Sequence, residues 1–95
     1  MSEPRVDLQS IVCWSETPVS IEINREVVLM NVSRDRCYGL GDTGSEIWRR
    51  LEKPIRLSDL CLQLEEMYDA PREMIELDVL KMIESLVKDD LVSCL

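Results

Sequence analysis

Residues 27–41 read Val27-Val28-Leu29-Met30-Asn31-Val32-Ser33-Arg34-Asp35-Arg36-Cys37-Tyr38-Gly39-Leu40-Gly41. The pattern predicts an apolar strand, a charged turn and a second, very short strand that ends at glycines, after which Thr43 opens a helix. A short strand with a glycine near its middle leaves unpaired N–H and C=O groups at the edge of a sheet. We interpret this edge as a place where an extended peptide pairs as an additional strand.

Composition limits the classes of function. The chain has 95 residues, a formal net charge of −8 and no histidine. This length fits one domain, and an acidic protein repels phosphate backbones, so we expect no nucleic-acid partner. No window approaches the ~20 apolar residues of a membrane span, and the first five residues lack the features of a signal peptide. We therefore expect a cytoplasmic protein that does not contact a membrane.

The cysteines give no indication of a zinc site, a redox motif or a catalytic nucleophile. Cys13, Cys37, Cys61 and Cys94 form no C-x-x-C pair, which is the spacing that zinc and redox motifs use. A catalytic cysteine needs a basic partner, and the commonest one, histidine, is absent from this chain. We expect reduced cysteines, no metal site, no cofactor and no enzyme activity.

The strands are expected to follow one another as a meander. Residues 1–18 are predicted to form an N-terminal arm, with a possible short strand at Ile11–Trp14. Val19–Ile23 alternates apolar and polar residues, which predicts a half-buried strand, and Val27–Val32 is expected to be the central and most buried strand. In the following strand, Tyr38 and Leu40 share one face, and Cys37 and Gly39 share the other.

Three helices are predicted after the strands. Thr43-Gly44-Ser45-Glu46 fits a capping box, and Pro54 is expected to end the helix that follows it. Ser58 is the expected N-cap of a second helix. Pro71 suits the first turn of a third helix, which runs to about Lys88 and is followed by a possible short strand within residues 91–95. Three strands followed by three helices predict an α+β fold of the winged helix-turn-helix kind, with a three-stranded antiparallel sheet.

These residues also carry a family resemblance. The stretches Val27–Met30 and Arg36–Trp48 resemble the core of the PqqD-like proteins, which are the recognition elements for RiPP precursor peptides. The resemblance continues through residues 57–60, 68–69, 78–83 and 90–92, so we expect the recognition domain to span residues 19–95. The short length and Glu52-Lys53-Pro54-Ile55 are most similar to the stand-alone leader-binding proteins of lasso-peptide clusters. Two turns depart from the family pattern: Gly41 stands where asparagine is frequent, and Arg25-Glu26 where Asp-Gly is frequent.

The resemblance implies a non-catalytic adaptor, or peptide chaperone. In this family the leader of the precursor lies antiparallel along the third strand, and its apolar side chains enter the groove between that strand and the third helix. The implied residues are, on the strand, Arg36, Cys37, Tyr38, Gly39 and Leu40, and on the helix, Met74, Asp78, Lys81 and Met82. The resemblance further implies delivery to a leader peptidase, a transglutaminase-like cysteine protease, with a macrolactam cyclase as a further candidate partner.

The sequence alone also allows other interpretations. A winged-helix DNA-binding regulator would have the same fold, but the third helix and its end carry Arg72, Lys81 and Lys88 against six acidic residues, which disfavours contact with phosphates. Tyr38 fits an ordinary core residue as well as a pocket wall, and Met74 and Met82 fit core packing equally well. The pattern also leaves open which flank of the third helix faces the peptide.

Overall fold

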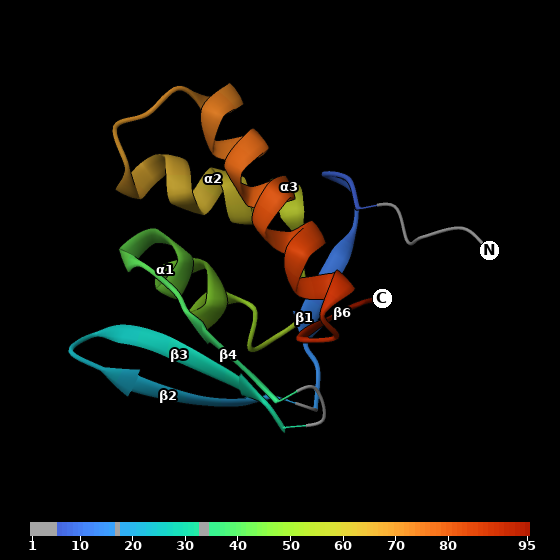
Figure 1. Cartoon of the computed structure of the whole chain (residues 1–95). Helices are drawn as coiled ribbons and strands as arrows, with labels where there is room; N and C mark the ends of the chain where they lie inside the picture. Colours follow the sequence, from blue (N-terminus) through green and yellow to red (C-terminus); the bar gives the residue numbers. More distant parts are fainter. Residues whose placement is uncertain (1–5, 17, 33–34) are drawn as a thin grey trace.

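Two small antiparallel sheets and three helices make up residues 6–16, 18–32 and 35–95, which are the residues that this computed structural model describes (Figure 1). The elements in chain order are β1 (Ile11–Trp14), β2 (Val19–Ile23), β3 (Glu26–Asn31), β4 (Arg36–Gly39), α1 (Asp42–Arg50), β5 (Ile55–Arg56), α2 (Leu57–Met67), α3 (Arg72–Lys88) and β6 (Val92–Cys94). One sheet has the order β2-β3-β4 and the other β5-β1-β6. The predicted α+β fold is confirmed, and the second sheet is an addition to it.

The β2–β3 hairpin is closed by a two-residue turn. Asn24 and Arg25 have φ angles of 53° and 70°, and the strands on either side pair Ile23 with Glu26. Two successive left-handed residues are the signature of a type I′ turn, whose twist matches that of the strands. Arg25 is an unusual residue for this conformation, and its carbonyl accepts a hydrogen bond of 2.7 Å from Arg49 Nη2 of α1. This turn sets the register of the hairpin.

The helices cover only one face of the β2-β3-β4 sheet (Figure 1). Val27, Leu29 and Asn31 of β3 are buried, whereas Met30 between them is exposed. The central position predicted for β3 is therefore confirmed, but the strand is buried along one face only. The prediction that β2 buries one of its faces is wrong, because all five of its residues are exposed. Val19, Ile21 and Ile23 lie on the face of the sheet that no helix covers.

Both predicted helix caps are absent. The N-caps of α1 and α2 are Gly41 and Arg56, and neither forms a side-chain capping bond. Ser45 is instead fully buried, where its hydroxyl accepts from the Val27 N–H at 2.8 Å and donates to the Leu40 carbonyl at 3.0 Å. Ser45, a variable position of the predicted capping box, therefore joins β3, the end of β4 and α1. Helix α1 ends at Arg50, before the predicted stop at Pro54.

The N-terminal segment from Leu8 onward belongs to the body of the protein. The N–H groups of Leu57 and Ser58 donate to the carbonyls of Ser10 and Leu8, each at 2.9 Å. The β1 strand is the middle strand of its sheet and buries Val12 completely, so the expected arm contains a core strand. The short strands suggested at Ile11–Trp14 and near the C-terminus are confirmed. Residues 1–5 and 17 of the arm, and residues 33–34 of the charged turn, lie outside the described residues.

Replacing Ser45 with alanine tests whether its hydroxyl stabilises the contact between β3, the end of β4 and α1. Loss of its hydroxyl leaves the buried Val27 N–H without an acceptor, which should lower the free energy of unfolding by about 1–3 kcal/mol. The matched control is Ser58→Ala, which removes a serine that caps no helix and should change stability by less than about 0.5 kcal/mol. Urea denaturation of both variants measures the difference. Equal losses would show that Ser58 does cap α2 in solution.

Candidate functional site

The hydrogen bonding of β4 leaves one side of this strand free. The N–H of Leu40 donates to the Val27 carbonyl of β3 at 2.9 Å. Because backbone groups alternate in direction along a strand, Arg36 and Tyr38 also pair with β3, whereas the N–H and C=O groups of Cys37 and Gly39 point away from it. Strand β4 is the last in its sheet, so these groups lie on an open edge. This is the edge that the sequence predicted.

Gly39 is not required by the fold itself. Its φ is not positive, and a Cβ atom at this position would meet no other atom within 4 Å. Neither backbone strain nor internal packing therefore explains a glycine in the middle of β4. The absence of a side chain leaves the outer face of the edge open for the close approach of another chain.

The inner side of β4 lies beside α3. Tyr38 and Leu40 are half-buried and pack against the core. A Cβ atom on Gly44 of α1 would lie 3.4 Å from Leu40 Cβ and 3.6 Å from Met82 Cε. Leu40, Gly44 and Met82 therefore converge where β4 leads into α1, and two of the predicted site residues meet there.

The face of α3 near this junction is set by helical spacing. Met74, Asp78 and Met82 follow one another at intervals of four residues, so they form one row. Asp78 lines a cavity of about 150 Å³ between the three helices, together with Thr43, Ile47, Leu64, Tyr68, Ala70, Ile75 and Val79. Met74 is 58% exposed. Lys81, next to this row, is also exposed and lines none of the cavities described.

This cavity adds residues that sequence reasoning missed. Thr43, Tyr68 and Ala70 line it, and the last two belong to the connection between α2 and α3. Their positions depend on how that connection folds back over α1, for which the local sequence carries no signal. The cavity offers an apolar space near one end of β4, with a carboxylate on its wall.

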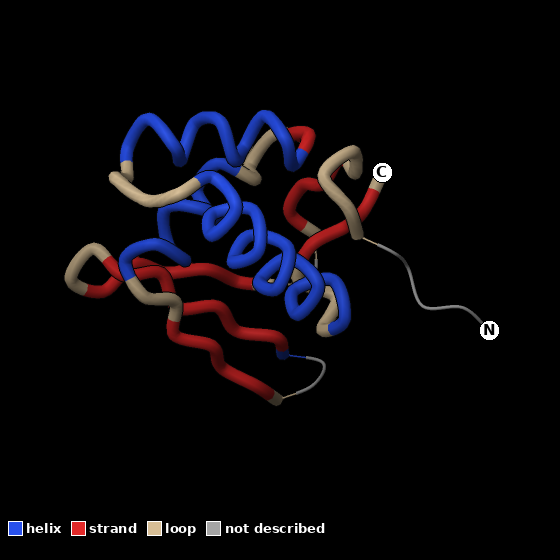
Figure 2. The backbone as a smooth tube through the Cα atoms, turned by 90° about the horizontal axis from the view of Figure 1, so that it is seen from above, coloured by secondary structure: helices blue, strands red, loops and turns tan. Residues whose placement is uncertain are grey.

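The C-terminal end of α3 meets the beginning of β4. Asn31 of β3, which pairs with Arg36, donates from Nδ2 to the Asp89 carbonyl just after α3 at 3.0 Å. A cavity of about 240 Å³ lies at the same end, lined by Met30, Asn31, Val32, Asp35, Arg36 and Cys37. Helix α3 thus lies alongside β4 from Met82 to Asp89, in the helical layer above the strands (Figure 2). The predicted groove would lie between the inner side of β4 and this helix, but neither cavity near the ends of β4 is lined by residues of both elements.

The hydroxyl of Tyr38 is an unusual feature of the groove wall. Its oxygen is buried and has no hydrogen-bond partner within the described part of the chain. A buried polar group without a partner costs about 1–3 kcal/mol. Tyr38 packs as the core-residue interpretation expected, but it also holds an unused donor next to the open edge.

The Cys61 thiol is fully buried. Burial, followed by the neighbouring Glu76 carboxylate, raises the pKa of the Cys61 thiol, so this cysteine stays protonated at neutral pH. Among residues 6–16, 18–32 and 35–95, no three metal-ligating side chains gather in one place. Within the same ranges, no helix is both long and apolar enough to cross a bilayer.

Replacing Tyr38 with phenylalanine tests the unpaired hydroxyl. The change removes a buried polar atom without altering the ring, so the free energy of unfolding should rise by about 1 kcal/mol. Thermal and urea denaturation of the peptide-free protein measure the effect. A loss of stability would instead show that the hydroxyl has a partner in solution, such as an ordered water.

Comparisons with known proteins agree with this arrangement. Residues 26–92 match the protein family described as coenzyme PQQ synthesis protein D (PqqD). Among solved structures, the chain is similar to TbiB1 in complex with the TbiA(beta) leader peptide, with 28% identity over 85% of this chain and 94% of that chain, and a TM-score of 0.79. Curated proteins gave no match. Since the family match includes β3, β4 and all three helices, we conclude that this chain belongs to the PqqD family.

Proposed function

We propose that this protein is a non-catalytic adaptor that binds the leader segment of a ribosomally synthesised precursor peptide along β4. The observation that carries the proposal is the open edge of β4, where Cys37 and Gly39 direct unpaired backbone groups away from the sheet. The similar TbiB1 structure is a complex with a leader peptide, which supports the same use here. The leader would extend the β2-β3-β4 sheet by one antiparallel strand.

Backbone contacts at the strand edge and side-chain contacts in the groove would contribute differently to leader recognition. Backbone bonds to Cys37 and Gly39 would bind any extended peptide, whatever its sequence. A leader side chain opposite Tyr38 would point inward, toward the groove, because directly opposed residues share a face of the sheet. Met82 and the exposed Met74 would adapt to different apolar leader side chains.

Charged groups would set the register of the leader. Arg36, Asp78 and Lys81 lie on or beside the groove, and no ion pair joins any of them to another described residue. Each could pair with an opposite charge on the leader, a contact worth about 0.2–1 kcal/mol while it stays exposed. Such contacts would select among peptides that the backbone alone would not distinguish.

The same proposal extends to the biosynthetic context. The resemblance of Glu52-Lys53-Pro54-Ile55 to lasso-peptide proteins supports a lasso precursor and a cytoplasmic location. The adaptor would then deliver the precursor to a transglutaminase-like leader peptidase, with a macrolactam cyclase acting afterwards. Peptidase assays with and without the adaptor test this step, since delivery requires faster leader removal in its presence.

A proline at Gly39 tests the placement of the leader. Gly39→Pro removes one outward N–H and leaves the bonds between β3 and β4 intact. A synthetic leader should therefore bind at least tenfold more weakly, which is a loss of about 1.4 kcal/mol in binding free energy. Fluorescence anisotropy measures this binding, and duplex DNA should not bind at physiological salt.

The matched control for this variant is Ser20→Pro, at the opposite edge of the same sheet. It introduces the same ring at an outward N–H, and leader affinity should stay unchanged. If a folded Gly39→Pro protein bound the leader normally, the leader would not lie along β4.

A charge at Met82 tests the helix side of the groove. Met82→Glu places a carboxylate beside Leu40 and should weaken leader binding at least tenfold. Leu77→Glu, on an exposed position of the same helix, is the control and should leave binding unchanged. Circular dichroism confirms that both variants fold before titration. Equal affinities for the two folded variants would exclude Met82 from the groove.

A further inference from the structure

The opposite edge of the sheet, β2, is built in a similar way. Since Val27 and Leu29 direct their backbone groups toward β4, Val28 and Met30 pair with Ile21 and Val19 of β2. The N–H and C=O groups of Ser20 and Glu22 therefore point away from the sheet. No other described segment forms a backbone hydrogen bond with these two residues.

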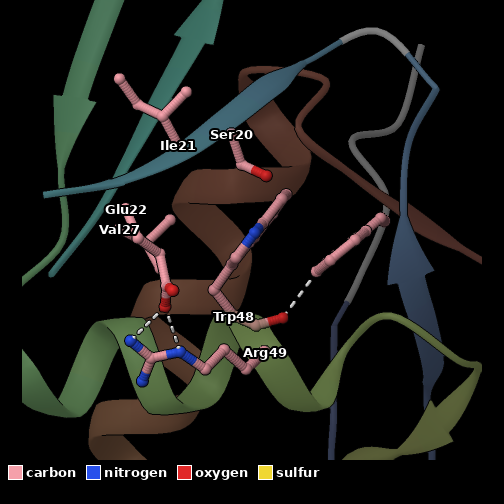
Figure 3. Close-up of a pocket in the computed structure, with 7 residues that line it drawn as sticks. Ser20, Ile21, Glu22, Val27, Trp48 and Arg49 are labelled. Carbon is pink, nitrogen blue, oxygen red and sulfur yellow. Dashed lines mark hydrogen bonds and ion pairs between the residues drawn. The ribbon is translucent and has the colours of Figure 1, made fainter. Parts of the chain in front are cut away.

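A cavity of about 290 Å³ lies beneath this edge (Figure 3). Its walls are Trp14, Ser20, Ile21, Glu22, Val27, Trp48 and Arg49. The two tryptophan rings are stacked, with centroids 5.0 Å apart and an interplanar angle of 14°, and Trp14 Nε1 donates to the Trp48 carbonyl at 2.7 Å. At ~30 Å³ for each water molecule, the cavity has room for about ten waters, or for one large side chain.

Trp48 has an unused donor at this cavity. The residue is only 2% exposed, and its indole Nε1 has no hydrogen-bond partner among the residues that the structure describes. Its ring rises from α1 toward β2, and the Ser20 side chain points toward it (Figure 3). If the Trp48 ring turns so that this buried N–H faces the cavity, an acceptor on a bound segment would remove the cost of leaving it unpaired.

An edge strand is often protected by an inward-pointing charge, and Glu22 occupies such a position. Its carboxylate, however, accepts a hydrogen bond of 2.7 Å from Arg49 Nε, so the charge is compensated within the domain. Val19, Ile21 and Ile23 of the same strand are exposed β-branched residues that favour strand pairing. Edge β2 is therefore open and not protected by a free charge.

We propose that β2 and the cavity beneath it form a second strand-addition site, which binds an extended segment of a partner polypeptide. Residues of that segment opposite Ser20 and Glu22 point inward, and a large apolar side chain with a hydrogen-bond acceptor enters the cavity beside Trp48. Trp14 and β2 lie outside the stretch that matches the PqqD family. The proposal does not depend on leader binding at β4.

The inward-facing residues of β2 argue against a second copy of this chain as the occupant. A second β2 strand would direct Ser20 and Glu22 into the cavity, and neither offers apolar surface to pack against its two tryptophan walls. Two chains that each carry a net charge of −8 also repel each other. The same negative charge favours a partner segment that carries basic residues next to its apolar one.

The experiment uses a phage-displayed library of random dodecapeptides selected against the wild-type protein. Enriched peptides are synthesised and titrated into ¹⁵N-labelled protein, so that the indole N–H signal of Trp48 reports the cavity directly. We expect alternating apolar and basic sequences that shift this signal. They should bind Gly39→Pro normally and Ser20→Pro at least tenfold more weakly, the reverse of the pattern for the leader.

A second variant keeps the proposal testable if the Ser20→Pro protein does not fold. Ser20→Trp keeps the edge N–H but fills the cavity from within, and it should also weaken the selected peptides at least tenfold. The proposal is overturned if no sequence pattern is enriched, if the peptides bind both Ser20 variants normally, or if only Gly39→Pro removes binding. Sedimentation velocity provides a further check, because a dimer that Ser20→Pro dissociates would assign the edge to self-association instead.

Discussion

The geometry of both candidate sites depends on one hydrogen-bonded contact between β3 and the end of β4. The Leu40 N–H donates to the Val27 carbonyl, and the Ser45 hydroxyl bridges the Val27 N–H and the Leu40 carbonyl. This pairing decides which backbone groups of β4 are satisfied within the sheet and which face outward. Because β3 is shared, it also decides the direction of the backbone groups on β2. A shift of one residue would exchange the inner and outer faces of every strand.

The helical layer then makes the two faces of this sheet unequal. One face supplies buried residues such as Leu29, and the other keeps Ile21 and Met30 in contact with solvent. The two open edges differ in what lies beneath them. Met82 of α3 lies near Leu40 at the end of β4, and below β2 is the tryptophan-walled cavity. A peptide added at either edge would gain backbone hydrogen bonds from the strand and side-chain selectivity from the layer below.

Two unpaired polar groups lie close to these edges. The Tyr38 hydroxyl and the Trp48 indole N–H are both buried without a partner among the described residues, although most buried polar groups in proteins are satisfied. Each belongs to an aromatic residue that packs in the core, so the apolar part of the side chain stabilises the fold. The polar atom itself is buried without a hydrogen-bond partner among the described residues. Tyr38 lies on a strand that the family match includes, while Trp48 lies beneath β2, a strand that the match does not include.

The sequence by itself determined the order of β2, β3, β4 and the three helices, the acidic character and the position of the β4 edge, but not β5 or the second sheet. Periodicity located β3 and α3, because alternation and helical spacing are local properties of the chain. Local patterns did not reveal the role of Ser45, whose hydroxyl accepts a hydrogen bond from Val27 of β3, eighteen residues away. Nor did they show that β2 is exposed, since an alternating strand looks the same whether or not a second layer covers it. The tertiary structure alone decided these points and the three cavities, because burial and hydrogen-bond partners depend on residues that are distant in the chain.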